Sequence, residues 1–115
     1  MTQPIDLSSE QCQACRAGAP QVLGPERVSL LRLIPAWEIV CVNEVDRLRR
    51  TFPFSNFRQA LSFTVRVGEL AEAMGHHPQI VTEWGRVSID WWSHKIKGLH
   101  RNDFIAAAKT DGLYQ

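Results

Sequence analysis

The chain has 115 residues and a formal net charge of +1 at pH 7, a length that suits one compact domain. Apolar residues make up 44% of the chain and charged residues 22%, so the composition excludes wholesale disorder. The near-neutral charge argues against direct nucleic-acid binding. No run approaches the roughly 18 apolar residues of a membrane span.

Residues 1–24 are polar and interrupted by proline and glycine, and we expect a flexible N-terminal arm there, followed by a single domain over 25–115. The arm has no apolar core of a secretory signal, and an odd number of cysteines suits a disulfide framework poorly, so we expect a cytoplasmic protein. Cys12 and Cys15 form a lone C-x-x-C. A structural zinc site needs four ligands, which favours an incidental pair over a metal or redox role.

The first half of the domain predicts a helix and a hairpin. A short helix begins at Pro25, because proline is tolerated at the first helical position, and it ends at Pro35. The β-branched and aromatic residues of 37–42 predict a strand, and 47–54 predict a second. A turn at 43–46 joins the two strands into a hairpin.

The longest helical pattern covers 56–74, with Ser55 as its predicted N-cap and Gly75 just past its end. Its apolar residues form an arc wider than one sheet covers, which indicates either a broad core face or contact with another subunit. The arc consists of two stripes, Phe57, Leu61, Thr64, Gly68 and Ala71 beside Ala60, Phe63, Val67, Leu70 and Met74.

The second half predicts strands over 80–84 and 86–94, joined at Gly85, and a last helix over 102–109 with Asp103 in its first turn. Neither pair of strands is separated by a crossover helix. We therefore predict an α+β fold of two layers, with a four-stranded antiparallel sheet and the helices packed on one face. The order is helix, hairpin, helix, hairpin, helix.

A cluster of titratable residues is expected along one edge of this sheet. His76 and His77 follow the long helix, His94 ends the last strand, Asp103 opens the last helix, and Glu72 lies near the end of the long helix. An imidazole with a pKa near 6.5 exchanges protons at neutral pH, so the cluster suits general acid–base catalysis. Exposed or structural histidines and a metal site are the alternatives that the residues alone leave open.

The spacing within this cluster is specific, and it resembles the pattern of the pterin-4a-carbinolamine dehydratase family, bacterial type. The resemblance spans about Glu26 to the C-terminus and leaves His100 outside the pattern. The matching positions are an acidic residue, three spacers, an HHP triplet, an aromatic residue, a histidine and an aspartate. In this chain they are Glu72, His76, His77, Pro78, Trp84, His94 and Asp103.

The resemblance implies dehydration of 4a-hydroxytetrahydrobiopterin to quinonoid dihydrobiopterin and water, which recycles the pterin cofactor of phenylalanine hydroxylase. It implies no metal and no organic cofactor for the reaction itself. His76 and His94 would be the acid–base pair around the 4a-hydroxyl, and His77 would orient the pterin. Asp103 would position His94 or the substrate.

Four further residues are implied as substrate-binding. Glu72 would anchor the histidine loop, and Pro78 restricts His77 to an extended conformation. Trp84 or Trp92 would stack on the flat pterin, although a core position is the commoner fate of a strand tryptophan.

The resemblance also implies partners. We expect a homodimer or a dimer of dimers, formed in part through the apolar arc of the long helix. Some family members act as a dimerisation cofactor of a homeodomain transcription factor, so a regulatory module that binds a protein through that helix is the alternative function.

Overall fold

The computed structural model describes residues 7–10 and 21–114 and confirms the predicted α+β class. Four antiparallel strands form one sheet in the order β1-β2-β4-β3, comprising β1 (Glu38–Val42), β2 (Val45–Pro53), β3 (Gln79–Glu83) and β4 (Arg86–Trp91). The helices are α1 (Gly24–Leu31), α2 (Phe57–Met74), α3 (Arg101–Asp111) and two short 3₁₀ turns, η1 (Leu7–Ser9) and η2 (His94–Ile96). Within the described ranges, none of the helices could span a membrane.

The first hairpin has a tighter turn than predicted. Val42 pairs with Val45, so only Asn43 and Glu44 lie between the strands rather than the whole of 43–46. Both residues have positive φ angles, 52° and 65°. Two central residues with positive φ match the right-handed twist of the flanking strands, which explains the closure over two residues.

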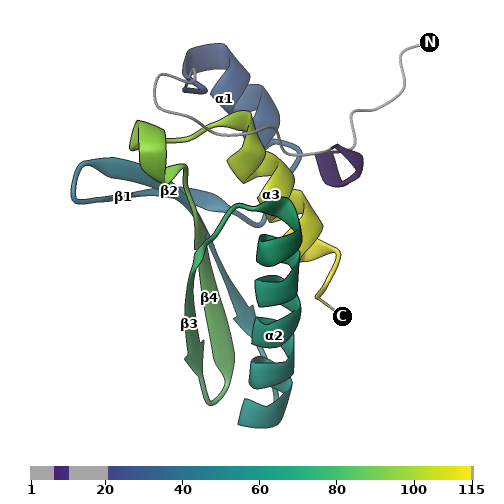
Figure 1. Ribbon diagram of the computed structural model, residues 1–115. Helices are drawn as coiled ribbons and strands as arrows, with labels where there is room; N and C mark the ends of the chain where they lie inside the picture. Colours follow the sequence, from purple (N-terminus) through teal and green to yellow (C-terminus); the bar gives the residue numbers. More distant parts are fainter. Residues whose placement is uncertain (1–6, 11–20, 115) are drawn as a thin grey trace.

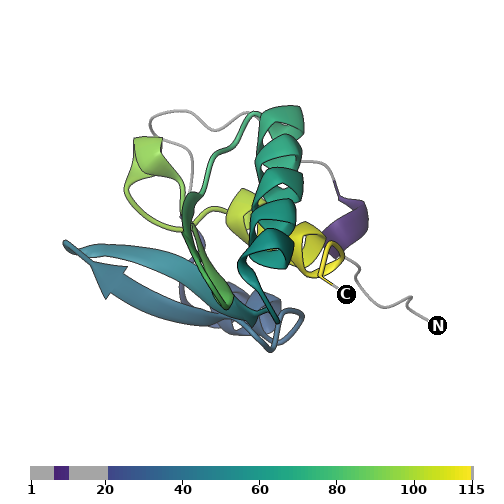
Figure 2. The same ribbon diagram turned by 90° about the horizontal axis from the view of Figure 1, so that it is seen from below.

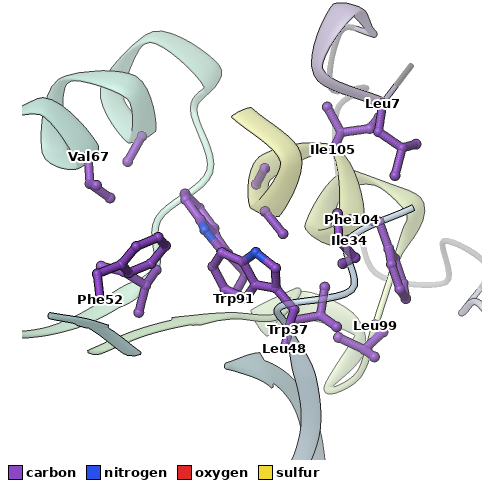
Figure 3. Packing of buried hydrophobic residues seen from close by; sticks show 14 of the residues in the cluster. Leu7, Ile34, Trp37, Leu48, Phe52, Val67, Trp91, Leu99, Phe104 and Ile105 are labelled. Carbon is purple, nitrogen blue, oxygen red and sulfur yellow. The ribbon is translucent and has the colours of Figure 1, made fainter. Parts of the chain in front are cut away.

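The core lies between one face of the sheet and helices α2 and α3 (Figures 1 and 2). Alternate residues of β2 and β4 point to this face, and apolar residues at helical spacing on α2 and α3 pack against them. Figure 3 shows this packing, with Trp91 in its middle. The fully buried side chains include Leu48, Phe52, Phe63, Val67, Val87, Ile89, Trp91 and Phe104.

Both ends of α2 are capped, and the N-cap differs from the predicted residue. The N-cap is Asn56 rather than Ser55, because the Asn56 side chain accepts from the Gln59 amide at 2.8 Å. Gly75 ends the helix as predicted, with a left-handed φ of 66°. The amides of Gly75 and His76 donate to the carbonyls of Glu72 and Ala71, which is the Schellman pattern.

Only part of the predicted apolar arc of α2 is buried, mostly residues of the second stripe together with Ala71 of the first. Ala60, Phe63, Val67 and Ala71 pack in the core. Phe57, Leu61 and Val65 remain 46%, 47% and 51% exposed. The arc is therefore wider than the core face, and its outer part lies on the surface of the chain.

Residues 7–10 and 21–24, which belong to the predicted N-terminal arm, contact the domain in the structure. Leu7 is 2% exposed and packs with α3, and the Val22 amide donates to the Leu99 carbonyl. Arg101 donates two hydrogen bonds to Glu10 at 2.9 and 3.0 Å, and this hydrogen bonding raises the pKa of Arg101. These contacts fasten residues 7–10 and 21–24 to the domain, whereas the C-x-x-C lies outside the described residues.

Candidate active site

His76 owes its position to the end of α2. The Schellman pattern turns the chain at Gly75, so the next side chain is directed back toward the core. His76 is only 8% exposed, and its ring stacks on Trp91 with centroids 5.4 Å apart and planes at 17°. A polar ring this buried needs a partner for its nitrogens.

That partner is Asp103, which opens α3 and is fully buried. Its Oδ1 atom lies 2.6 Å from His76 Nε2, and its Oδ2 atom accepts from the Ser93 hydroxyl and from the His100 amide, both at 2.8 Å. The bond from His100 belongs to a capping box, in which His100 Nδ1 accepts from the Asn102 amide at 3.0 Å. The cap of α3 and the histidine of the α2 loop therefore share one carboxylate.

This contact determines the tautomer of His76. An ionised carboxylate only accepts, so the proton of the neutral imidazole lies on Nε2. Nδ1 then carries the free lone pair and is the nitrogen that can accept a proton. Asp103 was expected to position His94 or the substrate, but the carboxylate contacts His76 instead, because the start of α3 packs beside the end of α2.

His77 and His94 are both exposed, His77 in the loop after α2 and His94 at the start of η2. His77 Nε2 contacts the carboxylate of Glu72, one turn back along α2, and both side chains are exposed. His94 Nε2 donates to the His77 carbonyl at 3.2 Å. The adjacent histidines thus divide into one buried ring and one exposed ring, as alternation along extended backbone requires.

The prediction that His94 ends the last strand is wrong. β4 ends at Trp91, and His94 begins η2. The cause is a β-bridge between Ser93 and Gly98, which turns the chain back on itself. A Cβ at Gly98 would lie 2.7 Å from the end of the Gln21 side chain, so a larger residue there would displace that side chain.

His76, His77 and His94 line one pocket of about 180 Å³, together with Gly75 and Lys95. This volume is below the roughly 300–1,000 Å³ of pockets that enclose a drug-sized ligand, so a bicyclic ligand would be covered only in part. The sequence offered no signal for Lys95 or for the buried Ser93. Both came into the site through the turn at 93–98.

The remaining predicted site residues lie either beside the histidine pocket or far from it. Glu72 reaches the pocket through His77, and Pro78 lies between His77 and β3. Trp92 contacts the His94 ring at 4.4 Å between centroids, but it is not a lining residue of the pocket. Trp84 is 70% exposed in the β3–β4 turn, at the opposite end of the sheet from the histidine loop in Figure 1. The five-residue strand β3 separates them by about 16 Å.

Within residues 7–10 and 21–114, no three His, Cys, Asp or Glu side chains come together as a metal site would require. The imidazole nitrogens of the three histidines can donate and accept protons around one pocket.

Comparison with known proteins decides the family. Residues 22–113 match the family described as pterin 4 alpha carbinolamine dehydratase. The chain is a member of that family. It is 58% identical over 108 residues to a protein of Nitrosococcus oceani with the provisional name pterin-4-alpha-carbinolamine dehydratase, covering 94% of this chain and 96% of the relative.

Two solved structures share the pterin dehydratase fold. A Brucella melitensis protein titled transcriptional coactivator/pterin dehydratase has a TM-score of 0.75 at 24% identity, covering 84% of this chain and all of that one. A pterin dehydratase-like protein, titled a RuBisCO assembly factor in the alpha-carboxysome, has a TM-score of 0.58 at 25% identity, covering 68% of this chain and 88% of that one.

Proposed function

We propose that the chain dehydrates 4a-hydroxytetrahydropterin to the quinonoid dihydropterin by histidine acid–base catalysis. The observation that carries this proposal is the buried His76–Asp103 pair, which opens onto a pocket that two further histidines line. Membership of the pterin dehydratase family supplies the substrate class. Through this reaction the protein would recycle the pterin cofactor of phenylalanine hydroxylase.

The chemistry assigns different tasks to His76 and His94. The N5 electron pair forms the C4a=N5 bond while the C4a–O bond breaks, and N5 must then lose its proton. His76, whose Nδ1 carries the free lone pair because Nε2 donates to Asp103, is suited to take that proton. His94 is exposed at the other side of the pocket and is suited to protonate the departing hydroxyl, which leaves as water.

Each turnover leaves His76 protonated and His94 deprotonated, so both must exchange protons before the next. The exposed ring of His94 exchanges directly with solvent. His77 supports the pocket in two ways, because its carbonyl accepts from His94 and its ring contacts Glu72. We propose that its exposed ring also orients the pterin.

The test is the lifetime of 4a-hydroxytetrahydropterin, formed in situ by a pterin-dependent hydroxylase and followed by its absorbance. The wild-type protein should shorten this lifetime, and His76→Ala should lower kcat by about 100- to 10,000-fold. The matched control is His100→Asn, which replaces a histidine outside the pocket by another good N-cap residue. Full activity of His76→Ala, or no acceleration by the wild-type protein, would refute the proposal.

A second candidate function rests on the exposed stripe of α2. Phe57, Leu61 and Val65 are spaced four residues apart, so they form one apolar row along the helix. We propose that a second copy of the chain covers this row in a homodimer or a dimer of dimers. A regulatory partner would compete for the same row. Light scattering of the purified protein should give the mass of a dimer or tetramer, and a monomer at micromolar concentration would contradict self-association.

A further inference from the structure

A row of three side chains leads from the open face of the sheet to the active-site pocket. The Arg47 guanidinium carbon lies 3.7 Å from the centroid of the Trp92 ring, and the Trp92 ring lies 4.4 Å from the His94 ring. Leu48 and Trp91 point into the core from paired positions of β2 and β4. By alternation, Arg47 and Trp92 lie side by side on the opposite face.

Arg47 is firmly held at the far end of this row. Its Nη1 atom donates to Asp90 at 3.2 Å and to Gln79 at 3.1 Å, and its side chain is 13% exposed. Its Nε atom is buried without a hydrogen-bond partner among the described residues. A buried donor without a hydrogen-bond partner carries a desolvation cost, which other interactions of the same guanidinium offset. The cation–π contact with the indole ring, 3.7 Å from the guanidinium carbon to the ring centroid, is such an interaction.

His94, at the near end, lacks comparable support of its own. It begins a three-residue turn, its side chain is exposed, and the hydrogen bond to the His77 carbonyl still allows the ring to swing about Nε2. An exposed ring in a turn would populate several rotamers. The Trp92 ring beside it removes that freedom, provided that Trp92 itself cannot move.

We propose that Arg47 is a positioning residue for the reaction, because it clamps Trp92 and thereby holds the His94 ring at the pocket. Its effect on catalysis rests on the proposed function, whereas its effect on the orientation of His94 can be measured without any turnover. The proposal gives Trp92 a place in the site although it does not line the pocket.

A purely structural role would have Arg47 only neutralise the buried Asp90. Arg49 already does so, with two hydrogen bonds of 2.7 Å to the two Asp90 oxygens. Hydrogen bonding to Asp90 raises the pKa of Arg49, so this neighbour stays charged. Arg49 lies on the same strand and face, opposite Asp90 and two residue pairs further from Trp92. Arg49→Met is therefore the matched control for Arg47→Met.

The first measurement is the NMR spectrum of the histidine ring protons, which feel the ring current of a neighbouring indole. Arg47→Met and Trp92→Ala should both shift the His94 resonances, while Arg49→Met should leave them in place. The His76 resonances should stay constant in all three variants, because His76 stacks on Trp91 instead. Unchanged His94 resonances in Arg47→Met would overturn the proposal, even if the wild-type protein had no dehydratase activity.

The second measurement is kinetic. We expect Arg47→Met to lower kcat about tenfold, because small misplacements of a catalytic group cost that order of rate, with KM changed less than about twofold. Arg47→Lys should recover part of kcat, since an ammonium keeps the charge over the ring without the flat contact. The double variant that combines Arg47→Met with Trp92→Ala should be no slower than Trp92→Ala alone.

Three kinetic outcomes would contradict the clamp. They are an unchanged kcat in Arg47→Met, an equal loss in Arg49→Met, and additive losses in the double variant. If Arg47→Met did not fold, Arg47→Lys would be measured in its place. The proposal would then be overturned by two results together, namely His94 resonances identical to wild type in Arg47→Lys and a wild-type kcat in Trp92→Ala. Absence of turnover in the wild-type protein would refute the proposed function alone.

Discussion

Replacing Asp103 by asparagine tests the buried part of the site with almost no change in shape. All three partners of the carboxylate donate to it, namely His76 Nε2, the Ser93 hydroxyl and the His100 amide. An asparagine has one acceptor oxygen and one NH₂ donor. If the oxygen serves Ser93 and His100, the NH₂ group faces His76 Nε2. The imidazole must then move its proton to Nδ1 in order to accept.

Both stability and catalysis should respond to this change. A hydrogen bond to a charged group contributes about 1.5–3 kcal/mol, so we expect the free energy of unfolding to fall by about 2–3 kcal/mol. The reversed tautomer also removes the base from Nδ1. A general base contributes about 100- to 10,000-fold, so kcat should fall at least about 100-fold. KM should change little, because Asp103 is fully buried and does not line the pocket.

The assay combines urea unfolding, dehydration kinetics and ¹⁵N NMR of the His76 ring. Asp111→Asn is the control on the same helix, where the carboxylate accepts from Trp37 Nε1 at 2.8 Å and from Arg50 at 2.6 Å. It should lose stability but keep kcat, because this pair of bonds lies at the opposite end of α3. A wild-type kcat in Asp103→Asn, or a proton that stays on His76 Nε2, would refute the reasoning.

Four further variants test the fold around the site. Gly75→Ala should lower the free energy of unfolding by about 1–2 kcal/mol, because the position requires a left-handed φ of 66°, and no loss in urea unfolding would contradict this. Gly68→Ala, in mid-helix with open space for a Cβ, should instead raise it by about 0.5–1 kcal/mol. Leu61→Glu should weaken self-association at least about tenfold in light scattering, since a buried leucine contributes about 1.5–3 kcal/mol, and an unchanged mass would place the interface elsewhere. Glu10→Gln should speed amide exchange in 7–10 by loosening the bonds to Arg101 while kcat stays constant, and unaltered exchange would argue against docking of η1.

The sequence predicted the elements well where local signals act. Alternation in 86–91, the helical repeat of α2 and the glycine at 75 are properties of neighbouring residues, and the structure confirms them. The sequence predicted the end of β4 and the burial of Leu7 poorly, because contacts between distant residues compete there with the local pattern. Ser93 continues the alternation of β4, yet its bridge to Gly98 ends the strand before His94. Leu7 lies in a polar stretch of the sequence, yet it is buried against α3.

The sequence by itself determined the family and the residues to examine, because the spacing from Glu72 to Asp103 is a property of the chain order. Only the tertiary structure decided which of them are in contact. His76 and Asp103 are 27 residues apart, and their contact exists because the end of α2 packs beside the start of α3 over Trp91. The length of β3 leaves Trp84 at the other end of the sheet, and the pairing of β2 with β4 brings Arg47 to Trp92. Side-chain partners across such distances depend on how layers pack, and no local pattern encodes that arrangement.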